Sequence, residues 1–477
     1  MTRRLLSLIA IAACCTSAVV SAQQPPKPID YPKGYKISIK INNCTDSVLF
    51  MGYYYANMTL SLDTARPDKK GVFTFQSNDA VLYPGMYFFS NPSGNYTEFM
   101  VYHEKPVFSF ETDDDNWQMN MRTKNSRQNQ LFFGYHQMTR RIYSDIDSAK
   151  KNKVSEESFQ AYVRSRSREL DSIREAYIAK NPDCMLSLMM NATRPVDVPA
   201  VSANGDTLSN MQRYEYYRDH CFDNMPLDND MIVRTPKGIF YTAIANYLDQ
   251  TLSRLPADTV IVYVDRLIDR SRKAPEVFKY LVHTIAEKYL QSNVMSYDAI
   301  YVHMIKKYYM TGQAFWASPS VIDEQSKRAT TWDRILIGRT APELVLKDTH
   351  GKMHSLHALP NRYTLLIFWS PTCGHCKTMI PALYKKYEEL REQYDIAAFA
   401  ILSEPDEPTK PKWLKFIDDH GLDWINLNGG EANIDWHEVY DVVTTPQIFL
   451  LDKNKTIIAK HLNADLFERI MKERGAE

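Results

Sequence analysis

The sequence lacks features that mark several other protein classes. Lys plus Arg and Asp plus Glu both number 57, so the 477-residue chain carries no formal net charge. A nucleic-acid-binding protein needs a basic excess to neutralise phosphates, so no nucleic-acid partner is expected. Only 7 Cys and 16 Gly occur, which argues against a disulfide-stapled miniprotein and a glycine-rich loop scaffold. Beyond the N-terminus no apolar run is long enough to span a membrane.

What is present is typical of a large folded chain. Hydrophobic residues make up 44% and charged residues 24% of the sequence, which is ordinary globular usage. At about 100–200 residues per domain, this length predicts two to four domains. The fold class expected is therefore multidomain.

The N-terminus, residues 1–22, has the pattern of an export signal. Arg3 and Arg4 precede an apolar run, and small residues end at Ala22 before Gln23. An alternative stays open, in which the stretch ending at Cys14 is a lipobox and Cys14 carries an outer-membrane lipid anchor. Both interpretations place the mature chain in the periplasm or cell envelope, where disulfides are tolerated.

Two accessory regions follow a proline-rich linker. Residues 35–118 show short alternating strands, starting at 36–41 and 48–55 and separated by turn residues, which predicts an all-β sandwich. Residues 119–335 change to helical periodicity, with helices expected at 156–180, 238–255 and 274–291, and predict an all-α domain. Within it, Cys184 and Cys221 flank a polar break and are candidates for a structural disulfide or for two buried free thiols.

The chemistry is expected in the third region, residues 336–477, where strands and helices alternate. A largely apolar strand at 363–369 leads to the sequence Cys373-Gly374-His375-Cys376, and an amphipathic helix follows. Cys373 therefore lies at a helix N-terminus, where free N–H groups and the helix dipole stabilise a thiolate. Cys376 lies about one turn further and can close a small disulfide ring. This is the arrangement required for thiol–disulfide exchange.

This region resembles the thioredoxin fold, and specifically the exported TlpA/ResA-like thiol–disulfide oxidoreductases. The resemblance rests on features that lie apart in the sequence: Trp369 before the cysteine pair, Pro381 in the following helix, Thr445-Pro446 before a strand, and a closing helix at 463–474. The upstream regions resemble, more weakly, the β and helical accessory domains of unknown function found in Bacteroidetes-type exported proteins. The predicted α/β thioredoxin fold therefore follows two accessory domains.

The resemblance implies roles for these residues. Cys373 would attack and Cys376 would resolve the mixed disulfide, while Gly374-His375 would tune the pair toward a less reducing potential than that of thioredoxin. Substrate would bind at Thr445 and Pro446, with Pro446 in a cis peptide, and Trp369 would cover one side of the site. No metal or organic cofactor is expected.

Two carboxylates that the family uses near the buried thiol are replaced. Ile367 stands six residues before Cys373, where thioredoxins carry Asp, and Met379 stands three after Cys376, where ResA-like proteins carry Glu. Glu404 is a candidate to approach the site from the end of the next strand. A zinc site is not expected here, because the sequence has no second Cys/His pair at suitable spacing. A peroxiredoxin is also not expected, because the Pro and Thr that precede the nucleophile in that family are here Leu366 and Ser370.

Two functions follow from these patterns. The first is a reductase or isomerase of exported proteins that contain cysteines, supplied with electrons by a partner such as a membrane reductase. The second is a cell-envelope binding protein whose accessory domains recognise a partner, with the thioredoxin domain secondary.

Overall fold

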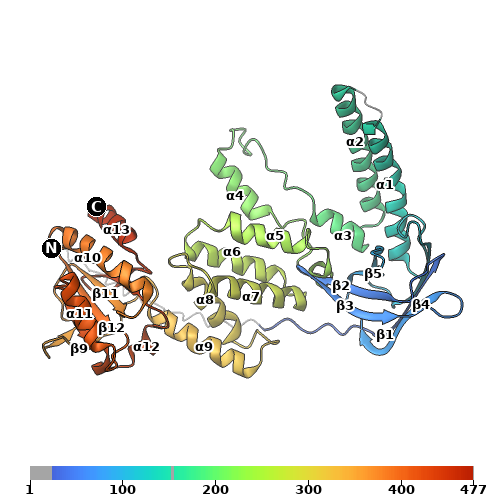
Figure 1. Ribbon diagram of the computed structural model, residues 1–477. Helices are drawn as coiled ribbons and strands as arrows, with labels where there is room; N and C mark the ends of the chain where they lie inside the picture. Colours follow the sequence, from blue (N-terminus) through green and yellow to red (C-terminus); the bar gives the residue numbers. More distant parts are fainter. Residues whose placement is uncertain (1–23, 152–154, 476–477) are drawn as a thin grey trace, which may run out of the picture.

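The computed structural model describes residues 24–151 and 155–475, and the chain order is a β region, a helical region and an α/β domain (Figure 1). The proposed export signal and Cys14 lie outside the described residues. Within the described ranges, no helix is both long and apolar enough to cross a bilayer.

The β region consists of two four-stranded sheets. One has the order β4-β1-β7-β8 and the other β3-β2-β5-β6. Pairing is antiparallel except between β1 and β7, which are parallel. The strands are β1 (Lys33–Asn42), β2 (Leu49–Tyr55), β3 (Met58–Ala65), β4 (Val72–Val81), β5 (Gly85–Ser90), β6 (Tyr96–Val101), β7 (Val107–Asp113) and β8 (Arg122–Lys124).

Aromatic side chains fill the space between the two sheets. In β1 the alternation that predicts a strand places Ile37 and Ile39 in the core and lysines outside. Between the sheets, Phe89 of β5 stacks on Phe75 of β4 with 5.5 Å between ring centroids and meets Phe110 of β7 edge-on at 5.6 Å. This confirms the predicted β-sandwich.

Two of its strands lie outside the sequence expectations. The strand β3 is mostly exposed and polar, so it carries no strong hydrophobic alternation. The short β8 pairs with β7 and extends the sheet past residue 118, to Lys124.

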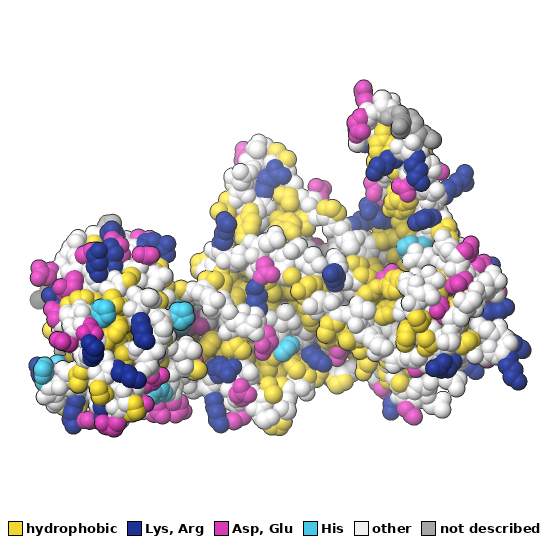
Figure 2. Space-filling view, in the orientation of Figure 1, with side chains coloured by type: hydrophobic (Ala, Val, Ile, Leu, Met, Phe, Trp, Pro, Cys, Tyr) yellow, Lys and Arg dark blue, Asp and Glu magenta, His cyan; other side chains and the backbone are white. Residues whose placement is uncertain are grey.

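The helical region begins with a hairpin of two long helices that projects beyond the sandwich (Figures 1 and 2). The second helix of this hairpin, α2, coincides with the helix expected at 156–180, and Ser155 caps it by accepting a hydrogen bond from the Ser158 N–H. The helices are α1 (Arg127–Lys151), α2 (Glu156–Lys180), α3 (Met185–Ala192), α4 (Asn210–His220), α5 (Phe240–Asn246), α6 (Ala257–Arg270), α7 (Pro275–Leu290), α8 (Asp298–Met304) and α9 (Pro319–Arg334), with a 3-10 turn η1 (Asp230–Arg234) and π-helical turns η2 (Tyr247–Thr251) and η3 (Ile305–Tyr309).

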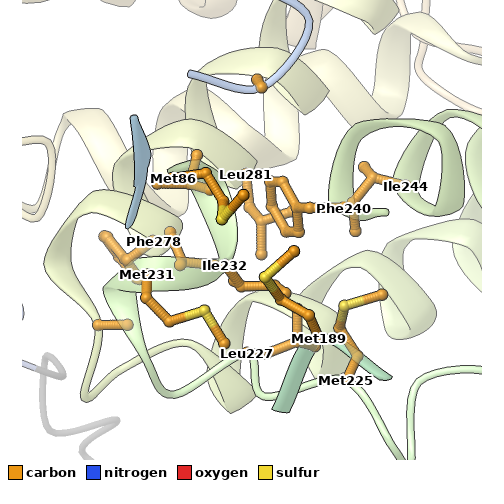
Figure 3. Packing of buried hydrophobic residues seen from close by; sticks show 14 of the residues in the cluster. Met86, Met189, Met225, Leu227, Met231, Ile232, Phe240, Ile244, Phe278 and Leu281 are labelled. Atoms are coloured by element: carbon orange, nitrogen blue, oxygen red, sulfur yellow. The ribbon is translucent and has the colours of Figure 1, made fainter. Parts of the chain in front are cut away.

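The β and helical regions share one hydrophobic core. Met86 of β5 lies beside Phe240 of α5 and Leu281 of α7, together with Ile232 of η1 (Figure 3). A backbone hydrogen bond of 2.7 Å, from the Ala56 N–H to the Val233 carbonyl, also joins the two regions. Because one continuous cluster of buried residues spans both regions, the two form a single structural unit.

The C-terminal domain is built on a five-stranded sheet of order β13-β12-β11-β14-β15. The first three strands are parallel, and β14 and β15 run antiparallel to them. Its elements are β9 (Val345–Lys347), β10 (Met353–Ser355), β11 (Tyr363–Trp369), α10 (Gly374–Tyr394), β12 (Ile396–Leu402), α11 (Lys410–His420), β13 (Ile425–Asn428), the 3-10 turn η4 (Gly429–Glu431), α12 (Trp436–Val439), β14 (Gln447–Asp452), β15 (Ile457–Lys460) and α13 (Ala464–Gly475).

Helices and loops cover both faces of this sheet, so the central strand β11 is buried along its whole length. On one face Ile367 and Trp369 pack with side chains of α10 and α13. On the other face Leu366 and Phe368 pack with Trp436 of α12 and with the segment that contains β9. This arrangement confirms the predicted α/β thioredoxin fold.

Polar contacts join the C-terminal domain to the helical region. Lys460, at the end of β15, forms an ion pair with Asp298 at the start of α8, and its Nζ also donates to the Ile335 carbonyl at 3.2 Å. In addition, Nε1 of Trp332 in α9 donates to Oδ2 of Asp441 at 2.5 Å. The helix α9 thus leads directly into the domain and is fixed against it (Figure 1).

Candidate active site

The two cysteines lie where the central strand passes into the first helix of the C-terminal domain. After β11 ends at Trp369, a short loop leads to Cys373, which is the N-cap residue of α10. Cys376 lies within the first turn and is completely buried, whereas Cys373 is half-buried. Both are free thiols in this structure. One sulfur is therefore accessible and the other is shielded.

The environment of Cys373 favours its thiolate. Burial works against ionisation of this thiol, but hydrogen bonds from the Thr445 side chain and from the backbone N–H groups of Cys376 and His375 outweigh burial and lower the pKa of Cys373 below its ordinary 9.0. When protonated, the thiol donates instead to the Thr445 carbonyl, with 3.1 Å between Sγ and the oxygen.

The environment of Cys376 favours its thiol. Burial is the main reason that the pKa of Cys376 rises to about 12, and the neighbouring Cys373 raises it further. A contact with the Ser370 backbone only partly offsets this rise. The pair is therefore asymmetric, with an ionisable outer sulfur and a protonated inner one.

The loop before β14 faces Cys373. The peptide bond between Thr445 and Pro446 is cis, as the sequence predicts, and both residues are half-buried. Earlier in the same loop, Val443 is 82% exposed. An apolar side chain so exposed in the loop that contacts Cys373 is a candidate substrate contact. The sequence gives no signal for it, because Val443 lies in a short polar-flanked stretch without periodicity.

Glu404 reaches the active-site loop, as the sequence suggested. Its Oε2 accepts hydrogen bonds from Ser370 Oγ at 2.7 Å and from Thr372 Oγ1 at 2.5 Å. The two hydroxyls also lie 2.7 Å apart. Glu404 follows β12, which pairs in parallel with β11, so the ends of the two strands bring the carboxylate to the loop. The loop that carries Cys373 is thus held from the neighbouring strand.

Comparisons with known proteins agree with this geometry. Residues 337–460 match the AhpC/TSA family. The chain is 24% identical over 139 residues to the thiol-disulfide oxidoreductase ResA of Bacillus thuringiensis, which covers 29% of this chain and 76% of ResA. It is 27% identical over 126 residues to the thioredoxin-like protein YneN of Bacillus subtilis, covering 26% of this chain and 71% of YneN.

The C-terminal domain belongs to the AhpC/TSA family. It is a thioredoxin-like domain homologous to ResA-type thiol-disulfide oxidoreductases, as the sequence resemblance implied. These relatives favour the oxidoreductase interpretation over that of a binding protein with a secondary redox domain.

Two further matches were found. Residues 147–332 match a domain of unknown function, DUF5106. A solved thioredoxin-like protein from Bacteroides caccae is 22% identical and covers 59% of this chain and 99% of its own, with a TM-score of 0.47.

The other predicted residues near the cysteine pair differ in how exposed they are. Gly374 and His375 are exposed at the start of α10, and a side chain added at Gly374 would meet open space. Ile367 is fully buried and Met379 half-buried, so both positions that lack the family's carboxylate are apolar. Within the described ranges, no group of three or more His, Cys, Asp or Glu side chains is arranged to hold a metal ion.

The prediction that Trp369 contacts substrate is wrong. Its side chain is completely buried and packs against Phe416, with 5.1 Å between ring centroids. It points to the α10 face of the sheet, where Ile367 also packs. Trp369 is therefore a core residue at the end of β11 and is not part of the surface that a substrate could contact.

Of the two alternatives for Cys184 and Cys221, the disulfide is not formed. Both are free thiols, and each has contacts of its own. Cys184 caps α3 by accepting from the Ser187 N–H, whereas Cys221 donates to the Arg218 carbonyl at 3.6 Å. The alternative, two packed free cysteines, is what the structure contains.

Proposed function

We propose that this protein is a thiol–disulfide oxidoreductase of exported proteins and that Cys373 and Cys376 carry the reaction. The observation that supports this most strongly is the opposite displacement of the two pKa values, down for Cys373 and up to about 12 for Cys376. A nucleophile must be ionised to attack, and a resolving thiol must stay protonated until its target forms.

In the reducing direction, the Cys373 thiolate attacks one sulfur of a substrate disulfide. The S–S bond of the substrate breaks, a Cys373–substrate disulfide forms, and the displaced thiolate takes up a proton. Cys376 then loses its proton and attacks the Cys373 sulfur, which releases the second substrate thiolate. Two electrons have passed to the substrate, and the protein is left with a Cys373–Cys376 disulfide that a dithiol partner, such as a membrane reductase, must reduce.

Binding of the substrate follows from the same loop. Thr445 and Pro446 would offer backbone groups to the substrate beside Cys373, and the exposed Val443 would add an apolar contact. The exposed His375 would favour the thiolate electrostatically when protonated. We place the protein in the periplasm or cell envelope, on the basis of the signal-like residues 1–22 or of a lipid anchor at Cys14.

The test is a trapping experiment with the full chain. A Cys376→Ser variant cannot resolve the mixed disulfide, so it should accumulate substrate proteins linked to Cys373 and released by dithiothreitol. A Cys373→Ser variant is the matched control and should trap none. If the Cys376→Ser protein is folded and traps no more than this control, the proposed function is wrong.

A further inference from the structure

A cleft separates the helical region from the C-terminal domain, next to the loop that holds Pro446. Its volume is about 360 Å³, which suits one side chain or a small ligand. The helical region contributes Asn293, Asp298 and Trp332, and the C-terminal domain contributes Tyr440, Asp441 and Gln447. The cleft therefore exists only where the two parts meet.

The ion pair between Asp298 and Lys460 is part of the lining of this cleft. The side chain of Lys460 is 4% exposed and that of Asp298 is 13% exposed. The second carboxylate oxygen of Asp298, Oδ1, is buried and has no hydrogen-bond partner among the described residues. An acceptor left without a donor is costly, so this oxygen favours a ligand that donates.

The cleft is continuous with the active-site loop. Gln447, in its lining, directly follows Pro446, and its side-chain nitrogen donates to the Asp441 carbonyl at 3.0 Å. Two residues before Gln447, the Thr445 carbonyl lies 3.1 Å from Cys373 Sγ. Met295, between the cleft residues Asn293 and Asp298, packs against the same core cluster as Cys373.

The charges in the cleft are unbalanced toward negative. Asp298 is paired with Lys460, whereas the Asp441 carboxylate accepts a hydrogen bond from the neutral indole N–H of Trp332. In the described part of the chain, no lysine or arginine lies within ion-pair distance of Asp441. Partial desolvation and the nearby Lys460 lower the pKa of His461, which disfavours a positive charge on this exposed side chain.

The walls suit the stem of a long basic side chain. Trp332, Tyr440 and Phe449 all line the cleft, so methylene groups would pack on aromatic rings while a cationic head meets Asp441. An acidic head would face two carboxylates, and a purely apolar side chain would leave the Asp298 oxygen without a donor.

We propose that this cleft binds a lysine or arginine side chain of the substrate, located within a few residues of the cysteine that Cys373 attacks. This inference rests on the proposed function, because the substrate peptide must be held at Thr445 and Pro446. An extended peptide advances about 3.3 Å per residue, so a residue close to the cysteine reaches past Gln447 into the cleft. The helical region would thereby select the substrates of the cysteine pair.

The experiment uses the full-length, pre-reduced protein in excess and a series of short peptides. Each peptide carries one cysteine joined by a disulfide to thionitrobenzoate, and lysine, glutamine or glutamate is placed at each neighbouring position in turn. Attack by Cys373 on the peptide sulfur releases coloured thionitrobenzoate, so a single turnover gives a second-order rate constant. The ratio between the lysine and glutamine peptides is the measured quantity.

We expect lysine to exceed glutamine by at least about fivefold at one or two positions, as for a partly buried ion pair. Asp441→Asn preserves the shape of the side chain and should reduce this ratio to near one. Glu473→Gln removes the same charge from the exposed end of α13, near Tyr394 and at the opposite end of α10 from Cys373, and should leave the ratio unchanged.

The outcomes separate the two proposals. If no peptide releases thionitrobenzoate in a Cys373-dependent way, the proposed function fails, and this inference with it. If release occurs but lysine and glutamine react equally, if glutamate is preferred, or if the preference survives in Asp441→Asn, the oxidoreductase stands and the cleft is not a basic-residue site.

Discussion

The difference in reactivity between the two thiols can be predicted from their surroundings. Near pH 7, a pKa of about 12 leaves roughly one Cys376 in 10⁵ ionised, whereas a pKa below 9.0 leaves more than about one Cys373 in 100 ionised. Ionisation alone thus favours Cys373 by more than about a thousandfold. The more basic thiolate is intrinsically more nucleophilic, so each ionised Cys376 should react roughly 20–30 times faster than each ionised Cys373. A preference of at least about thirtyfold remains.

Alkylation of the reduced, full-length protein measures this preference. A short pulse of iodoacetamide at pH 7 is followed by unfolding, labelling of the remaining thiols with an isotopically heavy reagent, and mass spectrometry of the two sites. Cys373 should carry the light label and Cys376 the heavy one, and complete burial of Cys376 should widen the gap. In the denatured protein the two rates should converge.

The pH dependence gives an independent check of the sign. Because the thiolate reacts, the rate at Cys373 should rise with pH along a titration curve whose midpoint lies below pH 9.0, since its pKa is lowered, while the rate at Cys376 should have its midpoint near pH 12. A Cys373→Ser variant tests whether Cys376 stays slow without its neighbour. Comparable labelling of the two thiols in the folded protein at pH 7 would refute the proposed roles.

Three further predictions concern the framework of the site. Leu281→Ala in the shared core should cost about 2–5 kcal/mol, and in urea unfolding followed by circular dichroism the β and helical regions should lose structure in one transition; two separate transitions would contradict a single unit. Lys460→Met leaves Asp298 buried without its cation and should lower the free energy of unfolding by about 3 kcal/mol, and adding Asp298→Asn should recover much of that loss; an unchanged stability would show that the pair is unimportant. Glu404→Ala removes the acceptor of two loop hydroxyls and should slow thionitrobenzoate release about tenfold, and Glu404→Gln should have an intermediate rate. Equal rates in the wild type and both variants would show that Glu404 is not needed for the reaction of Cys373.

The parts of the site that lie close together in sequence could be predicted from it. Cys373 and Cys376 stand between a buried strand and an amphipathic helix, and that local pattern alone defines a helix N-terminus with one exposed and one shielded thiol. The cis peptide before Pro446 and the limits of α2 were also predictable, the first from the family resemblance and the second from helical periodicity behind a serine cap.

The parts that depend on distant segments could not be derived in this way. Glu404 meets Ser370 across 34 positions and Asp298 meets Lys460 across 162. Such pairs are decided by how strands align and how domains dock, which local periodicity does not encode. The burial of Trp369 also depends on distant segments. Its side chain lies on the face of the sheet that α10 and α13 cover, and both helices come later in the chain. The shared core behind Met86 likewise needs both regions in place.

The division of the cores suggests how chemistry and selection are separated. The cysteine pair, Glu404 and the Pro446 loop belong to a domain whose two core clusters include no residue of the sandwich. The helical region meets this domain through the polar contacts of Asp298 and Trp332 beside the substrate loop, and through the apolar side chains of Met295 and Ile335. A change in the cleft should therefore alter which substrates bind and leave the pKa of Cys373 unaltered. Since Thr445 and backbone N–H groups of α10 set that pKa, the accessory regions can vary between proteins without disturbing the exchange reaction.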